Sequence, residues 1–218
     1  LCANFLILSE NRKKIRKEKL PKKFNKNFAE SIIKKLPFNL TTSQKNVILE
    51  INKDLESNKR MFRIIQGDVG SGKTIVSLLA IINVIKSGYQ CALMSPTEIL
   101  AKQHYELTKK ILKDNDFKID FLTGKTEYKK RKETISNLLN GKTDLLIGTH
   151  ALFQKKINFK KLGLVVIDEQ HKFGVRQRSD LAKKGGDDCD VLLMSATPIP
   201  RTMTVSYTHL TLPTIVGV

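Results

Sequence analysis

The fold of this chain is decided by one stretch, Gly67-Asp68-Val69-Gly70-Ser71-Gly72-Lys73-Thr74. A strand-like run at 61–66 leads into it, and an apolar, helix-like run at 75–85 follows it. The glycines let successive backbone N–H groups point into one concavity, where the following helix adds the positive end of its dipole. The spacing predicts a nucleotide-binding P-loop made of all eight residues. Lys73 would reach the β- and γ-phosphates as a catalytic residue, and the Thr74 hydroxyl would bind Mg²⁺.

A second group of candidate catalytic residues is the acidic pair Asp168 and Glu169, which directly follows four apolar residues, 164–167. The end of a buried strand is the place where a P-loop nucleotide hydrolase carries its magnesium-binding acid. We expect Asp168 to hold Mg²⁺, through water, and Glu169 to orient or deprotonate the attacking water. Together with Lys73, these two acids are the predicted catalytic residues.

Strand-like and helix-like runs alternate along the chain. The expected strands are 61–66, 90–95, 118–122, 144–148, 164–167 and 191–194, and the expected helices are 44–55, 75–85, 98–112 and 127–139. This alternation predicts an α/β fold with a mostly parallel sheet covered by helices on both faces. Small polar residues end each strand, and ligands of such sheets bind at the carboxyl ends of the strands.

Composition sets limits on the class of protein. The 218 residues suffice for one large domain, or for one domain with an appendage. The formal charge of +18 suits a polyanionic partner, although the excess of Lys over Arg and the abundant Ile and Asn are also what an AT-rich genome produces. No apolar run approaches the roughly 20 residues of a membrane span, so no membrane partner is expected. The scattered cysteines (Cys2, Cys91 and Cys189) lack metal-ligand spacing and indicate a reduced, cytoplasmic protein.

The first 35 residues are dense in lysine, and Pro21 interrupts their helical spacing. We expect a basic helical linking segment at 1–35, either a solvated helix with some apolar contacts or a helix that contacts DNA. The main domain is expected at 36–204, with Thr41, Thr42 or Ser43 capping its first helix. Because the first residue is Leu, the chain is expected to begin inside a longer gene product.

Six stretches, taken together, resemble the motifs of the RecG family of superfamily 2 DNA helicases. They are Leu36-Pro-Phe-Asn-Leu-Thr-Thr-Ser-Gln44, the P-loop, Ala92-Leu-Met-Ser-Pro-Thr-Glu-Ile-Leu-Ala-Lys-Gln-His104, Gly148-Thr-His-Ala-Leu152, Asp168-Glu-Gln-His-Lys-Phe-Gly-Val-Arg-Gln-Arg178 and Ser195-Ala-Thr-Pro-Ile-Pro-Arg-Thr202. The resemblance covers about 36–204 and implies a RecA-like, ATP-binding motor domain. Taken alone, His104 is expected to be an ordinary helix-face residue.

The resemblance also implies roles for further residues. Gln44 would recognise adenine, and Phe38 would lie near the base. Contacts with the DNA backbone are implied for Pro96, Thr97, Thr123, Gly124, Thr149 and His150. Coupling of the γ-phosphate to the DNA contacts is implied for His171, Ser195 and Thr197.

Enzymes of this family use ATP for branch migration and fork reversal on forked DNA, in repair and recombination. They have a second motor domain, which carries an arginine finger, and an N-terminal wedge domain. The resemblance therefore implies that 1–35 is a remnant behind a missing wedge, and that the second motor domain is also missing. A finger is worth roughly 10³ to 10⁵ in turnover, so this chain is expected to bind ATP and to hydrolyse it poorly. The alternatives are an Mfd-like or other superfamily 2 translocase, and a nucleotide-binding or DNA-binding module without catalysis.

The end of the chain, 205–218, departs from the family pattern. Its opening, Val205-Ser-Tyr-Thr-His-Leu210, resembles a translation of the transposon mosaic-end adapter used in sequencing libraries. We therefore expect 205–218 to be a non-native tail. The alternative is a genuine strand, since Thr, Val and Tyr favour strands.

Overall fold

The computed structural model describes residues 18–24, 26–154, 156–169, 186–196 and 206–210. Their strands form one sheet in the order β3-β4-β2-β5-β6-β1-β7, and all six neighbouring pairs are parallel. The strands are β1 (Phe62–Gly67), β2 (Gln90–Met94), β3 (Ile119–Leu122), β4 (Leu145–Gly148), β5 (Leu162–Ile167), β6 (Asp190–Ser195) and β7 (Ser206–Leu210). The predicted parallel α/β fold is confirmed.

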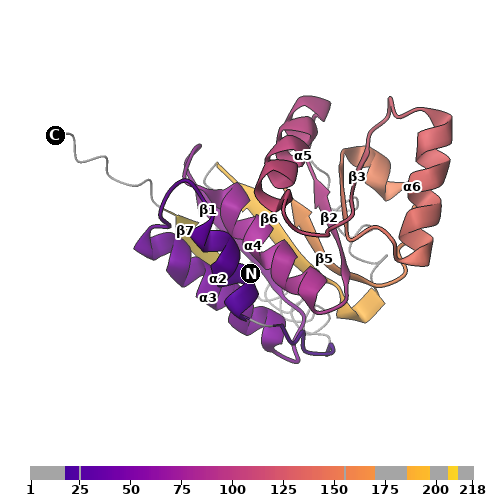
Figure 1. Cartoon of the computed structure of the whole chain (residues 1–218). Helices are drawn as coiled ribbons and strands as arrows, with labels where there is room; N and C mark the ends of the chain where they lie inside the picture. The colour runs from indigo at the N-terminus through magenta and orange to yellow at the C-terminus, as the bar shows by residue number, and fades with distance from the viewer. Residues whose placement is uncertain (1–17, 25, 155, 170–185, 197–205, 211–218) are drawn as a thin grey trace, which may run out of the picture.

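Helices cover both faces of this sheet, as expected (Figure 1). One face packs against α2 (Lys26–Lys34), α3 (Thr42–Glu56), α4 (Lys73–Lys86) and α5 (Glu98–Leu112). The other face packs against α6 (Tyr128–Asn140) and the short 3-10 helix η1 (His150–Phe153). A second 3-10 turn, η3 (Gly186–Asp188), precedes β6. None of the helices in the described ranges is long and apolar enough to cross a bilayer.

The strands are apolar on both sides because each side faces a separate core. In β2, Cys91 and Leu93 belong to the core under α3, α4 and α5, whereas Ala92 and Met94 belong to the core under α6 and η1. Successive side chains of a strand point to opposite faces, so a strand buried on both faces reads as a continuous apolar run. This explains why the runs in the sequence show no apolar and polar alternation.

Local sequence signals account for where the helices begin. Thr41 caps α3 in a capping box, since its hydroxyl accepts from Gln44 N while Gln44 Oε1 accepts from Thr41 N at 2.9 Å. The Thr97 hydroxyl accepts from Leu100 N and caps α5. The predicted elements are all present, with ends that differ by at most two residues. The 3-10 turns were not predicted, because four residues are too few for a periodic pattern.

The described part of the basic N-terminal segment packs against the main domain, at the start of β6. Lys19 Nζ donates to both carboxylate oxygens of Asp190, at 2.8 and 2.7 Å, and Lys22 Nζ donates to Asp190 Oδ2 at 2.7 Å. The three side chains have no exposed surface. Burial lowers the pKa of Lys19, and the carboxylate of Asp190 opposes that shift. Together with Ile32, which lies in the core, this cluster attaches residues 18–35 to the start of β6.

Residues 206–210 form β7, an edge strand parallel to β1. The structure thus has a strand where the non-native tail was predicted. Backbone pairing at a sheet edge is open to any chain of high β-propensity, so the origin of 205–218 stays a prediction.

The buried lysine and aspartate cluster gives a test of stability. Asp190→Asn removes the negative charge that faces the two buried ammonium groups of Lys19 and Lys22. We therefore expect it to lower the free energy of unfolding by about 3–5 kcal/mol. Asp114→Asn is the matched control, because Asp114 pairs with Lys35 at 3.5 Å while both side chains are 56% exposed. That exposed pair is worth about 0–1 kcal/mol. Urea denaturation of both variants measures the difference, and equal losses would contradict a structural role for the cluster.

Candidate functional site

The parallel sheet brings the carboxyl ends of its strands to one edge, where the predicted site residues gather. The P-loop follows β1, Ser195 ends β6, and Asp168 follows β5. The residues proposed to contact DNA follow the next three strands in the sheet order: Pro96 and Thr97 after β2, Thr149 and His150 after β4, and Thr123 and Gly124 after β3. The edge is therefore divided, with nucleotide candidates on β1, β6 and β5 and DNA candidates on β2, β4 and β3.

The P-loop turns sharply between β1 and α4. Gly70 and Gly72 both have φ of 84°, a backbone conformation that residues other than glycine rarely adopt. Gly72 is the N-cap of α4, so the first N–H groups of that helix face the loop. Asp68, Val69 and Gly70 are exposed at its tip. The loop therefore has the glycine conformations and the helix N-terminus that the prediction of an anion-binding site requires, and anion binding itself stays a prediction.

Lys73 is held inside this loop. Its Nζ donates to Gly67 O at 2.7 Å and to Asp68 O at 2.8 Å. Burial lowers the pKa of Lys73, while the carboxylates of Glu169, Asp168 and Asp68 act in the opposite direction. Both acids of the predicted catalytic pair therefore lie within electrostatic range of the P-loop lysine. Phosphate oxygens would compete with the two carbonyl groups for the same ammonium.

Gln44 connects α3 to the P-loop. Its Nε2 donates to Ser71 O at 2.9 Å, and its Oε1 is already used in the capping box. An amide has two N–H donors and two acceptor lone pairs, so one of each is left for an adenine edge. Phe38 lies in the turn before α3 and is 47% exposed, which suits stacking on a base. Adenine recognition by this pair stays a prediction.

The acidic pair lies where β5 ends. Asp168 is buried, its backbone N–H donates to Met94 O of β2 at 2.8 Å, and its Oδ1 accepts from Glu169 N at 2.9 Å. Glu169 has φ of 48°, the one positive value outside glycine among the described residues. Such a conformation costs of order 1–3 kcal/mol, and it concentrates at functional sites. The turn places the two carboxylates differently, with Asp168 inside and Glu169 half-buried at the surface.

His104 is a site residue that the sequence did not reveal. It is only 6% exposed, and its Nε2 lies 2.8 Å from Asp168 Oδ2. His104 does lie on a face of α5, and the structure adds that this face is a buried stripe of Ala101, His104, Thr108 and Leu112. The sequence signal that could have indicated this contact is a histidine among the residues of α5 that face the protein interior. Ser195 is also buried at this edge, whereas His171 and Thr197 lie outside the described residues.

The candidate DNA contacts differ in exposure. Thr97, Gly124 and His150 are exposed and Pro96 is half-buried, whereas Thr123 and Thr149 are buried. The Thr123 hydroxyl accepts from Lys125 N at 3.3 Å, and the buried Thr149 Oγ1 has no hydrogen-bond partner within the described part of the chain. In this arrangement the hydroxyls of Thr123 and Thr149 do not face solvent. The exposed members of the set carry the prediction of a DNA contact.

The donors present fit a magnesium nucleotide. Across the described ranges, no group of three or more His, Cys, Asp or Glu side chains could hold a metal by itself. Mg²⁺ commonly takes one or two protein oxygens and completes its shell with water and substrate phosphates. The buried Asp168 and the half-buried Thr74 supply such oxygens, and Ser71 Oγ, buried in the loop, finds no partner among the residues described. The residues therefore fit the ion without a dedicated protein cage.

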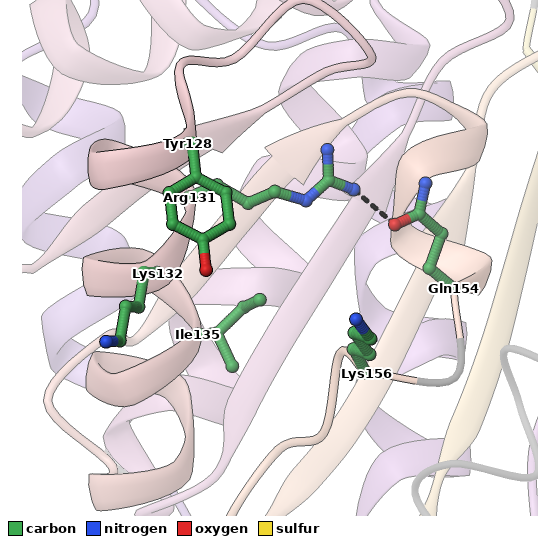
Figure 2. A pocket seen from close by; sticks show the side chains of 6 residues that line it. All are labelled: Tyr128, Arg131, Lys132, Ile135, Gln154 and Lys156. Atoms are coloured by element: carbon green, nitrogen blue, oxygen red, sulfur yellow. Dashed lines mark hydrogen bonds between the residues drawn. The ribbon is translucent and has the colours of Figure 1, made fainter.

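A basic cleft lies between α6 and the segment after η1 (Figure 2). Its volume is about 610 Å³, and it is lined by Tyr128, Arg131, Lys132, Ile135, Gln154 and Lys156. Arg131 donates to the Gln154 side chain across the cleft, as Figure 2 shows, and Tyr128 is 82% exposed. Three cations and an exposed aromatic ring line one opening, and the loop that contains Gly124 leads into α6.

Gly72 and Gly88 have similar positive φ values, so their alanine variants separate the effect of backbone strain on stability from the effect on nucleotide binding. A Cβ on Gly72 would lie 2.3 Å from Gln44 Nε2, whereas a Cβ on Gly88, with φ of 79°, would meet nothing within 4 Å. We expect Gly72→Ala to lower stability by about 1–2 kcal/mol and to abolish nucleotide binding. Gly88→Ala should lose similar stability and bind normally. Thermal unfolding and titration with a fluorescent ATP analogue measure both, and normal binding by Gly72→Ala would refute this account of the loop.

Known proteins match this chain in sequence and in fold. The DEAD/DEAH box helicase family model matches residues 41–205. The ATP-dependent DNA helicase RecG of Aquifex aeolicus is 49% identical over 203 residues, which are 92% of this chain and 26% of that protein. RecG of Bacillus subtilis is 51% identical over 174 residues, which are 80% of this chain and 25% of that protein. The chain thus spans about a quarter of the length of the curated relatives it matches.

Solved structures agree with these matches. A structure of RecG bound to a three-way DNA junction superposes with a TM-score of 0.82 at 42% identity, covering 95% of this chain and 28% of that one. The UvsW helicase from bacteriophage T4, at 16% identity and a TM-score of 0.59, shares the fold over 84% of this chain and 62% of its own. With the P-loop and the acidic pair in place, the chain belongs to the DEAD/DEAH box helicase family as a RecA-like motor domain of the RecG type.

Proposed function

We propose that this chain is the ATP-binding motor domain of a DNA helicase that drives branch migration and fork reversal in repair and recombination. The observation that best supports this proposal is the division of the sheet edge into two halves. One half holds the P-loop and the acidic pair, and the other half holds exposed candidate DNA contacts. A motor needs the two ligands to be coupled, and packed neighbouring strands of one sheet provide a physical path for that coupling.

The chain's own residues divide the work of hydrolysis. The N–H groups of the P-loop and the Lys73 ammonium bind the β- and γ-phosphates, and Gln44 with Phe38 orients the base. Thr74 and Asp168 would hold Mg²⁺, which supplies charge neutralisation at the transferring phosphoryl group. Glu169 orients or deprotonates the attacking water. The strained turn at Glu169 supports this role, because it holds the carboxylate at the surface beside buried Asp168.

DNA is the proposed second ligand. The related RecG was solved on a three-way DNA junction, and we extend that substrate class, branched or forked duplex DNA, to the protein that contains this domain. The basic cleft supports the proposal, because Arg131, Lys132 and Lys156 can neutralise backbone phosphates. Arg donors and an exposed ring such as Tyr128 suit phosphates and bases together. His171, Ser195 and Thr197 are proposed to couple the γ-phosphate to these contacts.

Two further points belong to the proposal. Efficient turnover is proposed to need a second RecA-like domain, which would supply an arginine finger from outside 36–204. We also assign the protein to the cytoplasm. This assignment is supported by Cys91 and Cys189, which are free rather than disulfide-bonded.

The first test is ATP turnover by the 218-residue chain with and without forked DNA. We expect the chain to bind a fluorescent ATP analogue, Lys73→Ala to lose that binding, and DNA to stimulate turnover little. A chain that binds no nucleotide would contradict the proposed function. Strong DNA-stimulated turnover that Lys73→Ala abolishes would instead show that no second domain is needed.

The basic cleft is tested by salt dependence. Arg131→Ala with Lys132→Ala removes two phosphate contacts, so the slope of log affinity for duplex DNA against log salt should fall by about 1.8. The matched control is Lys110→Ala with Lys113→Ala, which removes two exposed charges from the far end of α5. Fluorescence anisotropy between about 50 and about 200 mM salt measures both slopes. Equal slopes for both double variants would exclude the cleft from the DNA surface.

A further inference from the structure

One contact crosses the boundary between the two halves of the sheet edge. His104 belongs to α5, which follows β2, the first strand of the DNA half. Its Nε2 lies 2.8 Å from Oδ2 of Asp168, which follows β5, the first strand of the nucleotide half. β2 and β5 are neighbours in the sheet although about 70 residues separate them along the chain. The contact therefore joins two ligand-binding regions.

Two hydrogen bonds fix the orientation of the Asp168 carboxylate. Its Oδ1 accepts from Glu169 N at 2.9 Å, and its Oδ2 is engaged by His104. An ionised carboxylate only accepts, so Nε2 of His104 carries the hydrogen. Each oxygen then keeps its remaining lone pairs in a fixed direction. Partners of this kind orient metal-binding carboxylates, and their loss typically costs 10- to 100-fold in metal affinity.

The other ring nitrogen is unusual. Nδ1 of His104 is buried and, within the residues that the structure describes, has no hydrogen-bond partner. A buried polar atom without a hydrogen-bond partner lowers the stability of the folded protein. If His104 served only for packing, an apolar side chain would fill the same space without that penalty. The ring is thus held by its contact with Asp168, on a helix face whose other buried members are Ala101, Thr108 and Leu112.

The same helix begins at a candidate DNA contact. Thr97, its N-cap, is exposed, and His104 lies seven residues further, about 10 Å along the axis. A capped α-helix moves as a rigid body, so a displacement of its first turn also displaces His104. No hinge residue, glycine or proline, interrupts the helix between these two positions.

We propose that His104 is a positioning residue: it orients Asp168 for Mg²⁺ and transmits DNA binding at the start of α5 to that carboxylate. This inference rests on the proposed function, and it concerns equilibrium binding rather than turnover. By linkage, DNA then strengthens the binding of magnesium nucleotide by the same factor by which magnesium nucleotide strengthens the binding of DNA. Couplings of this kind are typically 5- to 150-fold.

The test measures the Mg²⁺ concentration for half-maximal binding of a non-hydrolysable ATP analogue, with and without forked DNA. In His104→Leu, which keeps the volume and loses the donor, we expect that concentration to rise about 10-fold and the effect of DNA on it to vanish. Affinity for the nucleotide in EDTA should stay unchanged. His104→Gln can place an N–H near Asp168, so it should recover part of both effects.

Thr108→Val is the matched control. Thr108 lies one turn further on the same buried stripe, and its hydroxyl donates to the backbone oxygen of His104 at 2.7 Å. This variant disturbs the packing of α5 and leaves Nε2 in place, so its Mg²⁺ requirement should match the wild type. Equal changes in Thr108→Val and His104→Leu would reduce His104 to a packing residue and overturn the inference.

The remaining outcomes separate this inference from the proposed function. A His104→Leu chain that melts like the wild type and keeps both its Mg²⁺ requirement and its response to DNA overturns the inference alone. A wild-type chain that binds neither the magnesium nucleotide nor forked DNA overturns the proposed function, and the inference with it. Loss of the response to DNA in His104→Leu, with recovery in His104→Gln, supports the link through α5.

Discussion

Parallel pairing of strands is the constraint on which the rest of this structure depends. Every connection must carry the chain back from the carboxyl end of one strand to the amino end of the next, so every loop that leaves a strand emerges at the same edge. Among the described residues that meet there are the P-loop after β1 and Asp168 and Glu169 after β5. The candidate nucleotide site is thereby assembled from residues about 100 positions apart in the chain.

Burial of both faces is what makes this edge rigid. Helices α3, α4 and α5 cover one face, and α6 with η1 covers the other, so the strands are held by two cores at once. Interiors packed in this way transmit displacement instead of absorbing it. The strained backbone at Glu169 and the positive φ of Gly72 persist because the surrounding packing determines them.

Buried charge is used sparingly and in pairs. Asp190 forms ion pairs with two lysines from the N-terminal segment, and Asp168 is hydrogen-bonded to His104. Desolvation is expensive for a charged group, so each buried carboxylate is hydrogen-bonded to more than one donor. The first cluster attaches the N-terminal segment to β6, and the second joins the two halves of the sheet edge. The large positive charge of the chain therefore has two parts, a few buried structural lysines and many exposed ones on helices such as α6.

The sequence by itself determined the P-loop motif, the order of strands and helices, a hydroxyl cap for α3 among Thr41, Thr42 and Ser43, and the family; the structure decided on Thr41. These depend on local spacing: glycines at fixed offsets, apolar runs of strand length, and a hydroxyl three residues before Gln44. Only the tertiary structure decided which strands are neighbours, because sheet order joins segments far apart in sequence. It therefore alone revealed the division of the edge, the contact of His104 with Asp168, the burial of Thr123 and Thr149, and the anchoring of Lys19 and Lys22 on Asp190. A side chain's partner across a fold leaves no periodic signal, since it depends on packing between elements rather than on spacing within one.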